Sequence, residues 1–230
     1  MDQLKTYLEN LEIQNIPQIL DKFELYYSLL IEWNNKFNLT SITDKDDVEI
    51  KHFIDSITSF NYIKDNSYLC DIGAGAGFPS IPLAILKPNC NFVLIDSLNK
   101  RINFLNELIN KLELKNCKCL HCRVEDFALK NRETFDYTIA RAVAPLNILL
   151  EYTIPLLKVN GILLAYKGSN IEDEIKASKN AFNLLNSSIS NKYTLTLPNG
   201  DFRTILEIKK NNKTSNKYPR SSNKPRTNPL

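Results

Sequence analysis

Three glycines at alternate positions are the most chemically specific feature of the sequence. Gly73, Gly75 and Gly77 follow the apolar segment 68–72 and precede another apolar stretch. Glycine lets a backbone turn sharply and approach a ligand without a Cβ atom in the way. A dinucleotide-binding loop has its third glycine one place later, where Phe78 stands here. The spacing therefore favours a ligand without a pyrophosphate group.

Acidic residues stand beside this loop and after the next two predicted strands. Asp71 precedes the loop, Asp96 ends the second predicted strand, and residues 124–126 follow the third. A carboxylate after the second strand can accept hydrogen bonds from both hydroxyls of a ribose. Groups after the third can contact an adenine edge, and the loop amides with nearby acids suit the carboxylate and ammonium of a methionine. The pattern predicts S-adenosylmethionine as the cofactor, with a purely structural turn as the alternative.

Short apolar strands separated by amphipathic helices are expected to position these residues. A parallel sheet brings the carboxyl ends of its strands to one edge, where open α/β sheets bind ligands. The segments 192–197 and 203–209 flank a Pro-Asn-Gly-Asp turn and predict an antiparallel hairpin. The predicted fold is α/β, a Rossmann-like methyltransferase sheet with an N-terminal helical extension and this C-terminal hairpin. We predict parallel strands near 68–72, 92–96, 117–121, 135–140 and 161–166, and helices near 79–86, 99–113, 145–157 and 171–186.

The chain divides into three predicted regions. Residues 1–65 show apolar residues at helical spacing, with one helix expected near 46–60, and form the extension. The methyltransferase domain spans 66–210. Residues 211–230 are rich in Lys, Asn, Ser and Pro, which predicts a basic, disordered tail.

Composition limits the classes of protein that the chain can form. With 230 residues, of which 43% are hydrophobic, it can bury one sizeable core. No apolar run approaches the roughly 20 residues that cross a bilayer, and no secretory segment is evident, so we expect a cytoplasmic protein without membrane contact. The net charge is +3, yet residues 209–230 carry seven lysines or arginines and no acid. That segment suggests contact with nucleic acid, or only a solvated surface.

Three of the five cysteines cluster at Cys117, Cys119 and Cys122, beside His121. Structural zinc sites use paired Cys-x-x-Cys turns that are far apart in sequence, whereas this segment alternates as a strand does. We predict thiols and no metal, because free cysteine prefers protein interiors.

The segments around these residues resemble the bacterial glucose-inhibited division protein B family, also called RsmG, which methylates guanine N7 in small-subunit (16S) ribosomal RNA. The resemblance covers about residues 26 to 208. In the tail, 218–220 and 229–230 are also similar, while 221–223 replaces a stretch that is often basic and glycine-rich. The segments that carry the resemblance are Trp33–Thr40, His52-x-x-Asp55-Ser56, Asp71–Pro79, Asp96-Ser97-x-x-Lys100-Arg101, Arg123–Glu125 and Arg141–Ala144.

The resemblance implies a cofactor site and an RNA site. To the glycines and Asp96 it adds, as cofactor contacts, Phe78, Val124, Glu125 and Arg141. Facing the cofactor or RNA it implies Asn38, His52, Lys100, Arg101, Arg123, Lys167 and Arg203. Among these, Arg141, Lys167 and Asn38 are expected to align the reactants. The expected partner is 16S ribosomal RNA or a small-subunit ribosomal particle, bound by a monomer.

Several of these residues also have a purely structural interpretation. Asn38 could simply end a helix, and His52 and Asp55 could form a pair on a helix surface. Lys100 and Arg101 begin a helix, where cations gain nothing from the helix dipole, so a ligand role is favoured.

The expected chemistry needs no catalytic base. Guanine N7 has an in-plane lone pair, so alignment of the reactants, which can supply roughly 7–11 kcal/mol, replaces deprotonation. The Asn/Asp-Pro-Pro-aromatic motif of amine methyltransferases and the Pro-Cys nucleophile of carbon-5 enzymes do not occur. The alternatives are methylation of another RNA base, a non-catalytic nucleotide-sensing RNA-binding module and, more distantly, a nicotinamide dehydrogenase.

Overall fold

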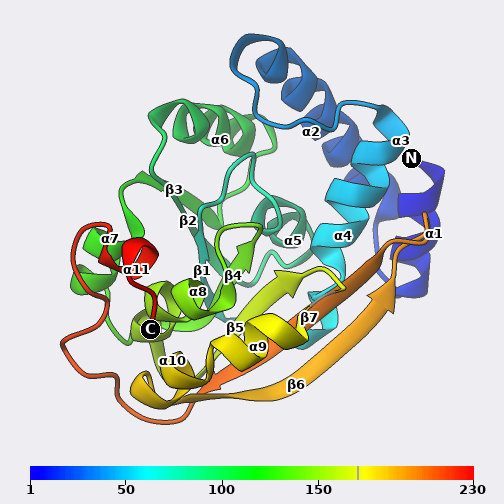
Figure 1. Cartoon of the computed structure of the whole chain (residues 1–230). Helices are drawn as coiled ribbons and strands as arrows, with labels where there is room; N and C mark the ends of the chain where they lie inside the picture. Colours follow the sequence, from blue (N-terminus) through cyan, green and yellow to red (C-terminus); the bar gives the residue numbers. More distant parts are fainter. Residues whose placement is uncertain (170) are drawn as a thin grey trace.

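A seven-stranded sheet forms the centre of the computed structural model, which describes residues 1–169 and 171–230 (Figure 1). The strand order is β3-β2-β1-β4-β5-β7-β6, and β1 to β5 are parallel. β6 and β7 form an antiparallel hairpin that pairs with β5 through β7. The predicted α/β class and its closing hairpin are confirmed. The strands are β1 (Tyr68–Ile72), β2 (Asn91–Asp96), β3 (Cys117–His121), β4 (Phe135–Arg141), β5 (Leu157–Lys167), β6 (Ser187–Thr196) and β7 (Phe202–Lys210).

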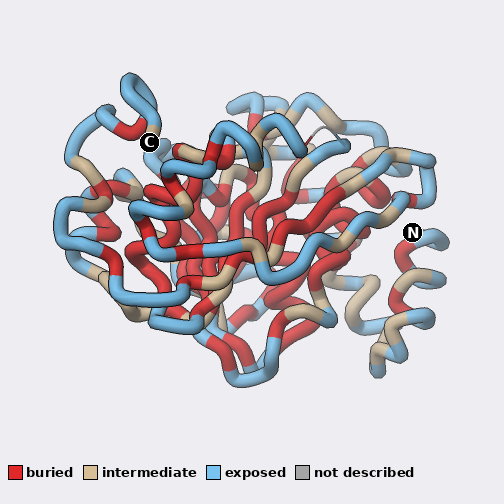
Figure 2. The backbone as a smooth tube through the Cα atoms, turned by 60° about the horizontal axis from the view of Figure 1, so that its bottom comes forward, coloured by how far each residue is buried: buried red, intermediate tan, exposed pale blue. Residues whose placement is uncertain are grey.

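Helices cover both faces of the sheet, because successive side chains of a strand point to opposite faces. In β1, Leu69 packs into one hydrophobic core while Cys70 and Ile72 pack into the other. Figure 2 shows the buried strands between these layers. The first core includes α1 (Asp2–Asn10), α2 (Ile16–Phe37), α3 (Lys45–Val48), η1 (Glu49–Ile54), α4 (Asp55–Ile57), α5 (Ser80–Leu86) and α6 (Asn99–Lys111). The second includes α7 (Val124–Lys130), α8 (Leu146–Thr153), η3 (Ile154–Leu156), α9 (Glu172–Ala177) and α10 (Lys179–Leu184).

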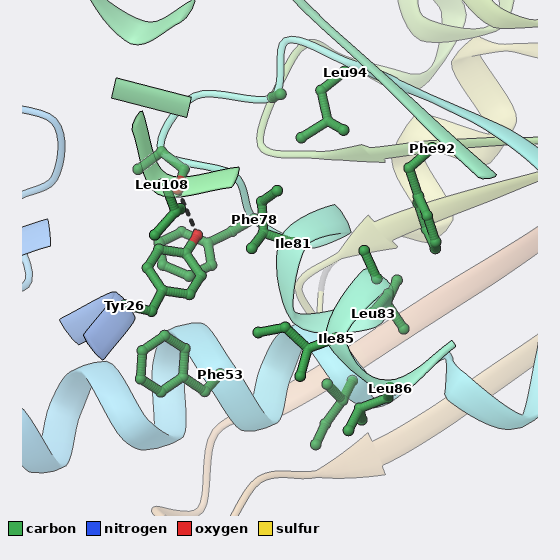
Figure 3. Packing of buried hydrophobic residues seen from close by; sticks show 14 of the residues in the cluster. Tyr26, Phe53, Phe78, Ile81, Leu83, Ile85, Leu86, Phe92, Leu94 and Leu108 are labelled. Carbon is green, nitrogen blue, oxygen red and sulfur yellow. Dashed lines mark hydrogen bonds between the residues drawn. The ribbon is translucent and has the colours of Figure 1, made fainter. Parts of the chain in front are cut away.

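The N-terminal extension packs directly against the glycine loop. Tyr26 of α2 stacks on Phe78 with 5.2 Å between the ring centroids, and its hydroxyl donates a 2.5 Å hydrogen bond to the Ala76 carbonyl. Phe53 of η1 contacts both rings (Figure 3). The extension therefore shares one core with the loop.

The local structure differs from the sequence prediction in several elements. The helix expected near 46–60 is split, and its middle turn, η1, is a π-helix. α7 was not predicted, and β5 and β6 begin four and five residues before the expected positions. α9 and α10 are separate helices that meet at Ser178. The hydrophobic pattern specifies which face is buried, but not these changes in helical pitch and strand length.

The C-terminal residues also differ from the prediction of disorder. Tyr218 and Leu230 pack against the second core, and the short helix α11 (Lys224–Thr227) lies beside α8 (Figure 1). Composition describes the tail in isolation, whereas the folded domain offers Arg220 a buried carboxylate partner, Glu151.

Two predicted absences concern membranes and metals. Among the described residues, none of the helices combines the length and hydropathy needed to cross a bilayer. All five cysteines are free thiols, and Cys117 and Cys119 lie in β3 as the alternating pattern predicted.

Candidate functional site

Two pockets meet at the edge of the sheet where β1, β2 and β4 end. Ala142 and Val143, which follow β4, line both pockets, and Ala142 has a left-handed φ of +56°. The glycine-loop pocket has a volume of about 520 Å³, and its walls include Gly73, Asp96, Arg101, Arg123, Val124 and Glu125. The Asp55 pocket has a volume of about 610 Å³, and its walls include His52, Asp55, Arg141, Lys167, Glu174 and Arg203.

The three loop glycines all have positive φ angles, but each has a different structural role. Gly73 lines the glycine-loop pocket, and the backbone N–H of Gly75 donates to Asp96 Oδ2 at 3.0 Å. A Cβ atom on Gly77 would lie 2.7 Å from the Tyr26 hydroxyl oxygen and 2.8 Å from Ile81 Cγ1. Gly77 is therefore required by packing against the extension.

Asp96 is held in a fixed orientation at the end of β2. Its Oδ1 accepts from the Leu98 N–H at 2.9 Å, and its Oδ2 also accepts from Arg101 at 3.1 Å. The carboxyl group is buried, so these donors keep it oriented. Its remaining lone pairs can meet ribose hydroxyls, and Arg101 belongs to the wall of the same pocket.

Asp71, at the foot of the glycine loop, is the unsatisfied acid of the site. Its carboxylate is buried, and neither oxygen has a hydrogen-bond partner in the described part of the chain. Burial raises the pKa of Asp71 to about 7, although nearby Ser80 and Arg141 act in the opposite direction. A buried carboxyl without a partner is costly. Asp71 lines neither pocket, so it would attract a cationic group, such as the ammonium of a methionine, from behind the glycine loop.

The third station lies at the start of α7. Glu125 is buried in the first turn of this helix, where a negative charge is favourable, and its Oε1 accepts a 3.4 Å hydrogen bond from the Tyr152 hydroxyl of α8. Arg123 precedes the helix and is exposed. Tyr152 lines the same pocket.

A buried carboxylate organises the second pocket. Asp55 Oδ2 accepts from Arg141 at 2.8 Å, and Asp55 Oδ1 accepts from Arg203 Nε at 3.0 Å. Only 3% of Asp55 is exposed. One acid thus fixes two guanidinium groups from β4 and β7, and Arg203 also pairs with Asp201 at 3.7 Å.

His52 is neutral, and both of its ring nitrogens form hydrogen bonds. Arg141 can only donate, so its 3.1 Å contact with His52 Nδ1 makes that nitrogen an acceptor, and Nε2–H donates to Thr40 Oγ1 at 2.9 Å. Burial, together with the charge of Arg141, lowers the pKa of His52 to about 3. The ring stacks on Phe78 with 4.3 Å between centroids, so the helix-surface interpretation of His52 and Asp55 is wrong.

Lys167 and Glu174 form the opposite wall of the Asp55 pocket. Lys167 Nζ donates to Glu174 Oε2 at 2.6 Å and to the Ala144 carbonyl at 3.0 Å. Glu174 Oε2 also accepts from the Leu146 N–H at 2.8 Å. Both bonds use Oε2, which leaves Oε1 to meet a donor on a substrate.

Several of the residues singled out from the sequence lie outside the walls of both pockets, among them Asp71, Gly75, Gly77, Phe78, Asn38 and Lys100. Asn38 ends α2 with a φ of +46°, and Lys100 donates to the neighbouring Phe37 carbonyl at 3.1 Å. The Phe78 ring is buried in the stack with Tyr26 and His52. Conversely, spacing in the sequence gave no signal for Tyr152, Glu174, Asn223 or Arg226, which line the pockets from helices and the tail.

The sheet order, the glycine loop and the acids near the ends of β1 and β2 define the class of an S-adenosylmethionine-dependent methyltransferase. Solved structures share this fold. M. jannaschii TYW2 in complex with AdoMet matches with a TM-score of 0.56 at 19% identity, over 69% of this chain and 76% of that one. A SAM-dependent methyltransferase from Aquifex aeolicus matches with a TM-score of 0.54 at 18% identity, over 71% and 93%.

The chain belongs to the GidB family, rRNA small subunit methyltransferase G, whose family model matches residues 19–197. Ribosomal RNA small subunit methyltransferase G of Streptococcus pneumoniae serotype 19F is 49% identical over 98% of this chain and 99% of its own length. The Lactococcus lactis protein of the same name is 46% identical over 100% and 98%. The predicted family, S-adenosylmethionine as cofactor and an rRNA methyltransferase activity are confirmed.

Proposed function

We propose that the protein transfers the methyl group of S-adenosylmethionine to N7 of a guanine in 16S ribosomal RNA, with the cofactor in the glycine-loop pocket and the guanine in the Asp55 pocket. The observation that carries this assignment is the wall of Ala142 and Val143 that the two pockets share. Methyl transfer requires donor and acceptor in line at close range, and adjoining pockets supply that arrangement.

The residues around the glycine loop fit the cofactor. The unpartnered carboxylate of Asp71 suits the ammonium of its methionine portion, and the Gly73 backbone can approach that portion closely. Asp96 would hold the ribose hydroxyls, and Val124 and Glu125 the adenine. The cofactor supplies an electrophilic sulfonium methyl group, and the protein supplies position and electrostatics.

The Asp55 pocket fits an anionic nucleotide with a guanine base. Arg141, Arg203 and Lys167 present cations to ribosomal RNA phosphates and to the guanine O6 atom. N7 must keep its lone pair free for the methyl group, so these donors act beside it. The Glu174 carboxylate matches the N1–H and N2–H donors of guanine, which adenine lacks.

No base is needed, and His52 does not offer one. Its Nδ1 lone pair accepts from Arg141, and its pKa is lowered to about 3, so it takes up no proton near neutral pH. Its proposed role is to hold Arg141 and Phe78 in place beside the substrate.

The partner and the setting extend the same proposal. We infer that the protein acts as a monomer in the cytoplasm, on 16S ribosomal RNA or on a small-subunit ribosomal particle. Family membership and the cationic lining of the Asp55 pocket support an RNA substrate.

The product identifies the reaction. The protein is incubated with methyl-labelled S-adenosylmethionine and either deproteinised 16S ribosomal RNA or small-subunit particles, and the RNA is digested to nucleosides. Labelled 7-methylguanosine, whose imidazole ring opens under alkali, is the expected product. Label on adenine or cytosine would refute the N7 assignment, and binding without any incorporation would favour the non-catalytic RNA-binding module.

A further inference from the structure

The C-terminal segment, residues 214–230, reaches the wall of the glycine-loop pocket. Asn223 and Arg226 line this pocket together with Glu125 and Tyr152. Pro225, between them, is buried. Figure 1 shows the end of the chain turning back toward α7 and α8, the two helices that provide Glu125 and Tyr152.

A buried ion pair holds the middle of this segment. Glu151 of α8 is fully buried, with no exposed surface. Arg220 donates to its carboxylate three times, from the backbone N–H at 2.7 Å, from Nε at 2.9 Å and from an Nη atom at 2.7 Å. The same Nη atom donates to the Asn228 carbonyl at 2.8 Å, which closes the segment into a loop. A buried carboxylate needs such a partner, so the pair acts as a latch.

A second arginine fixes the start of the segment. Arg132, in the turn after α7, donates to the carbonyl of Thr214 at 2.7 Å and of Ser215 at 3.3 Å, and also to the Tyr218 carbonyl. Leu230 at the other end packs into the second core. Both ends and the middle are therefore attached, and the position of α11 is determined by the fold.

We propose that this segment is part of the cofactor site, with Asn223 and Arg226 forming the wall at its adenosine end. The inference rests on the proposed placement of the cofactor and assigns it two further contacts. Glu125 and Tyr152 mark the adenosine end, and the guanidinium of Arg226 lies close enough to Tyr152 to oppose the rise in its pKa that burial causes. A planar guanidinium stacks favourably on a flat aromatic ring, and a purine is such a ring.

The proposal separates two functions within the basic tail. Arg220 and Arg226 serve the cofactor site, whereas Lys217 and Lys224 are exposed, line neither pocket and remain available to RNA phosphates. A variant that only lowers the charge of the tail cannot separate cofactor binding from RNA binding. Two variants that remove one charge each, at Arg226 and at Lys224, can separate them.

The first test compares Arg226→Ala with Lys224→Ala, which removes the same charge from an equally exposed position in the same short helix that does not line the pocket. Binding of S-adenosylhomocysteine and of free adenosine is measured by calorimetry. We expect Arg226→Ala to weaken both by about 3- to 30-fold, the range of a cation–π contact, and Lys224→Ala to leave both unchanged. Equal affinities in Arg226→Ala and the wild type, or equal losses in the two variants, would overturn the proposal.

Asp96→Ala separates this inference from the cofactor assignment beneath it. If Asp96→Ala weakens S-adenosylhomocysteine binding and Arg226→Ala does not, only the role of the tail is refuted. If Asp96→Ala has no effect either, the placement of the cofactor in the glycine-loop pocket fails.

The second test opens the latch without leaving a buried charge. The double variant Glu151→Gln with Arg220→Gln keeps hydrogen-bonding groups in place and is checked for folding by circular dichroism. We expect faster trypsin cleavage after Lys217 and Arg226, weaker adenosine binding, and loss of the protection that S-adenosylhomocysteine gives the wild type. Wild-type cleavage rates and affinity in this variant would refute the latch.

Discussion

Replacement of Gly77 by alanine isolates the packing of the glycine loop from its binding function. Gly77 and Gly200 have similar left-handed φ angles, +95° and +87°. A Cβ atom on Gly200 meets nothing within 4 Å, whereas one on Gly77 lies 2.7 Å from the Tyr26 hydroxyl oxygen and 3.0 Å from Leu105 Cδ2. Gly200→Ala is therefore a control that carries the conformational cost alone.

The difference between the two variants has a predictable size. The left-handed conformation costs alanine about 1–2 kcal/mol at either position. Overpacking of a core adds typically about 1–3 kcal/mol, and only at Gly77. For a chain of this length, 1 kcal/mol corresponds to about 2–4 °C in Tm, so we expect Gly77→Ala to melt about 2–12 °C below Gly200→Ala.

Calorimetric melting without cofactor measures this difference. Tyr26→Phe provides a second comparison. It removes the hydroxyl oxygen nearest to the new methyl group, and it also removes the hydrogen bond to the Ala76 carbonyl. Gly77→Ala combined with Tyr26→Phe should then be more stable than the sum of the two losses predicts. Equal melting temperatures for Gly77→Ala and Gly200→Ala would refute the packing explanation of the third glycine.

Three further outcomes follow from the charges of the site. The pKa of Asp71 is about 7 in the fold against 3.8 in a model peptide, so its contribution to stability is lost as the pH rises from about 4 to 7. Asp71→Asn should therefore gain stability relative to the wild type over that range in urea unfolding, while its affinity for S-adenosylmethionine falls. The pH dependence of stability that His52 causes runs in the opposite direction. Because its pKa is about 3, its contribution to the free energy of unfolding is fully present above pH 6.5 and is lost as the pH falls toward 3. Turnover at saturating cofactor should accordingly stay flat between about pH 6.5 and 8.5, and a limb that disappears in His52→Gln would contradict this. Arg141→Lys keeps the charge but not the simultaneous contacts to Asp55 and His52, so single-turnover methylation should fall about 100-fold, the cost of roughly 1 Å of misplacement. An unchanged rate would remove Arg141 from the aligning groups.

The sequence contains enough information for the sheet and the first pocket because both depend on local patterns. The glycine spacing and the acids after two strands specify the cofactor edge, and the five parallel strands lie within a few residues of their predicted positions. The ring of Phe78 shows the limit of such patterns. Its position beside the glycines indicates ligand contact, but its side chain is buried against Tyr26, which is 52 residues earlier in the chain.

Contacts between distant segments explain the other differences. The Arg203 interaction with Asp55 joins residues 148 positions apart, and that of Arg220 with Glu151 joins residues 69 apart. Neither ion pair can be predicted from nearby residues, because a charged residue is assigned to the solvent-exposed surface unless its distant partner is known. The tail was therefore predicted to be disordered on its composition, although three donors of one arginine attach it to a buried acid.

The bond between the Tyr26 hydroxyl and the Ala76 carbonyl bears on how this enzyme can be engineered. A fragment that begins at residue 66 would keep every strand and every glycine, yet it would lose the side chains that cover Phe78 and face Gly77. The cofactor loop therefore cannot be transferred to another protein without the N-terminal residues that pack against it. Chimeras between relatives should exchange the first 65 residues together with the loop that they support, because a junction between them separates surfaces that fit only as a pair.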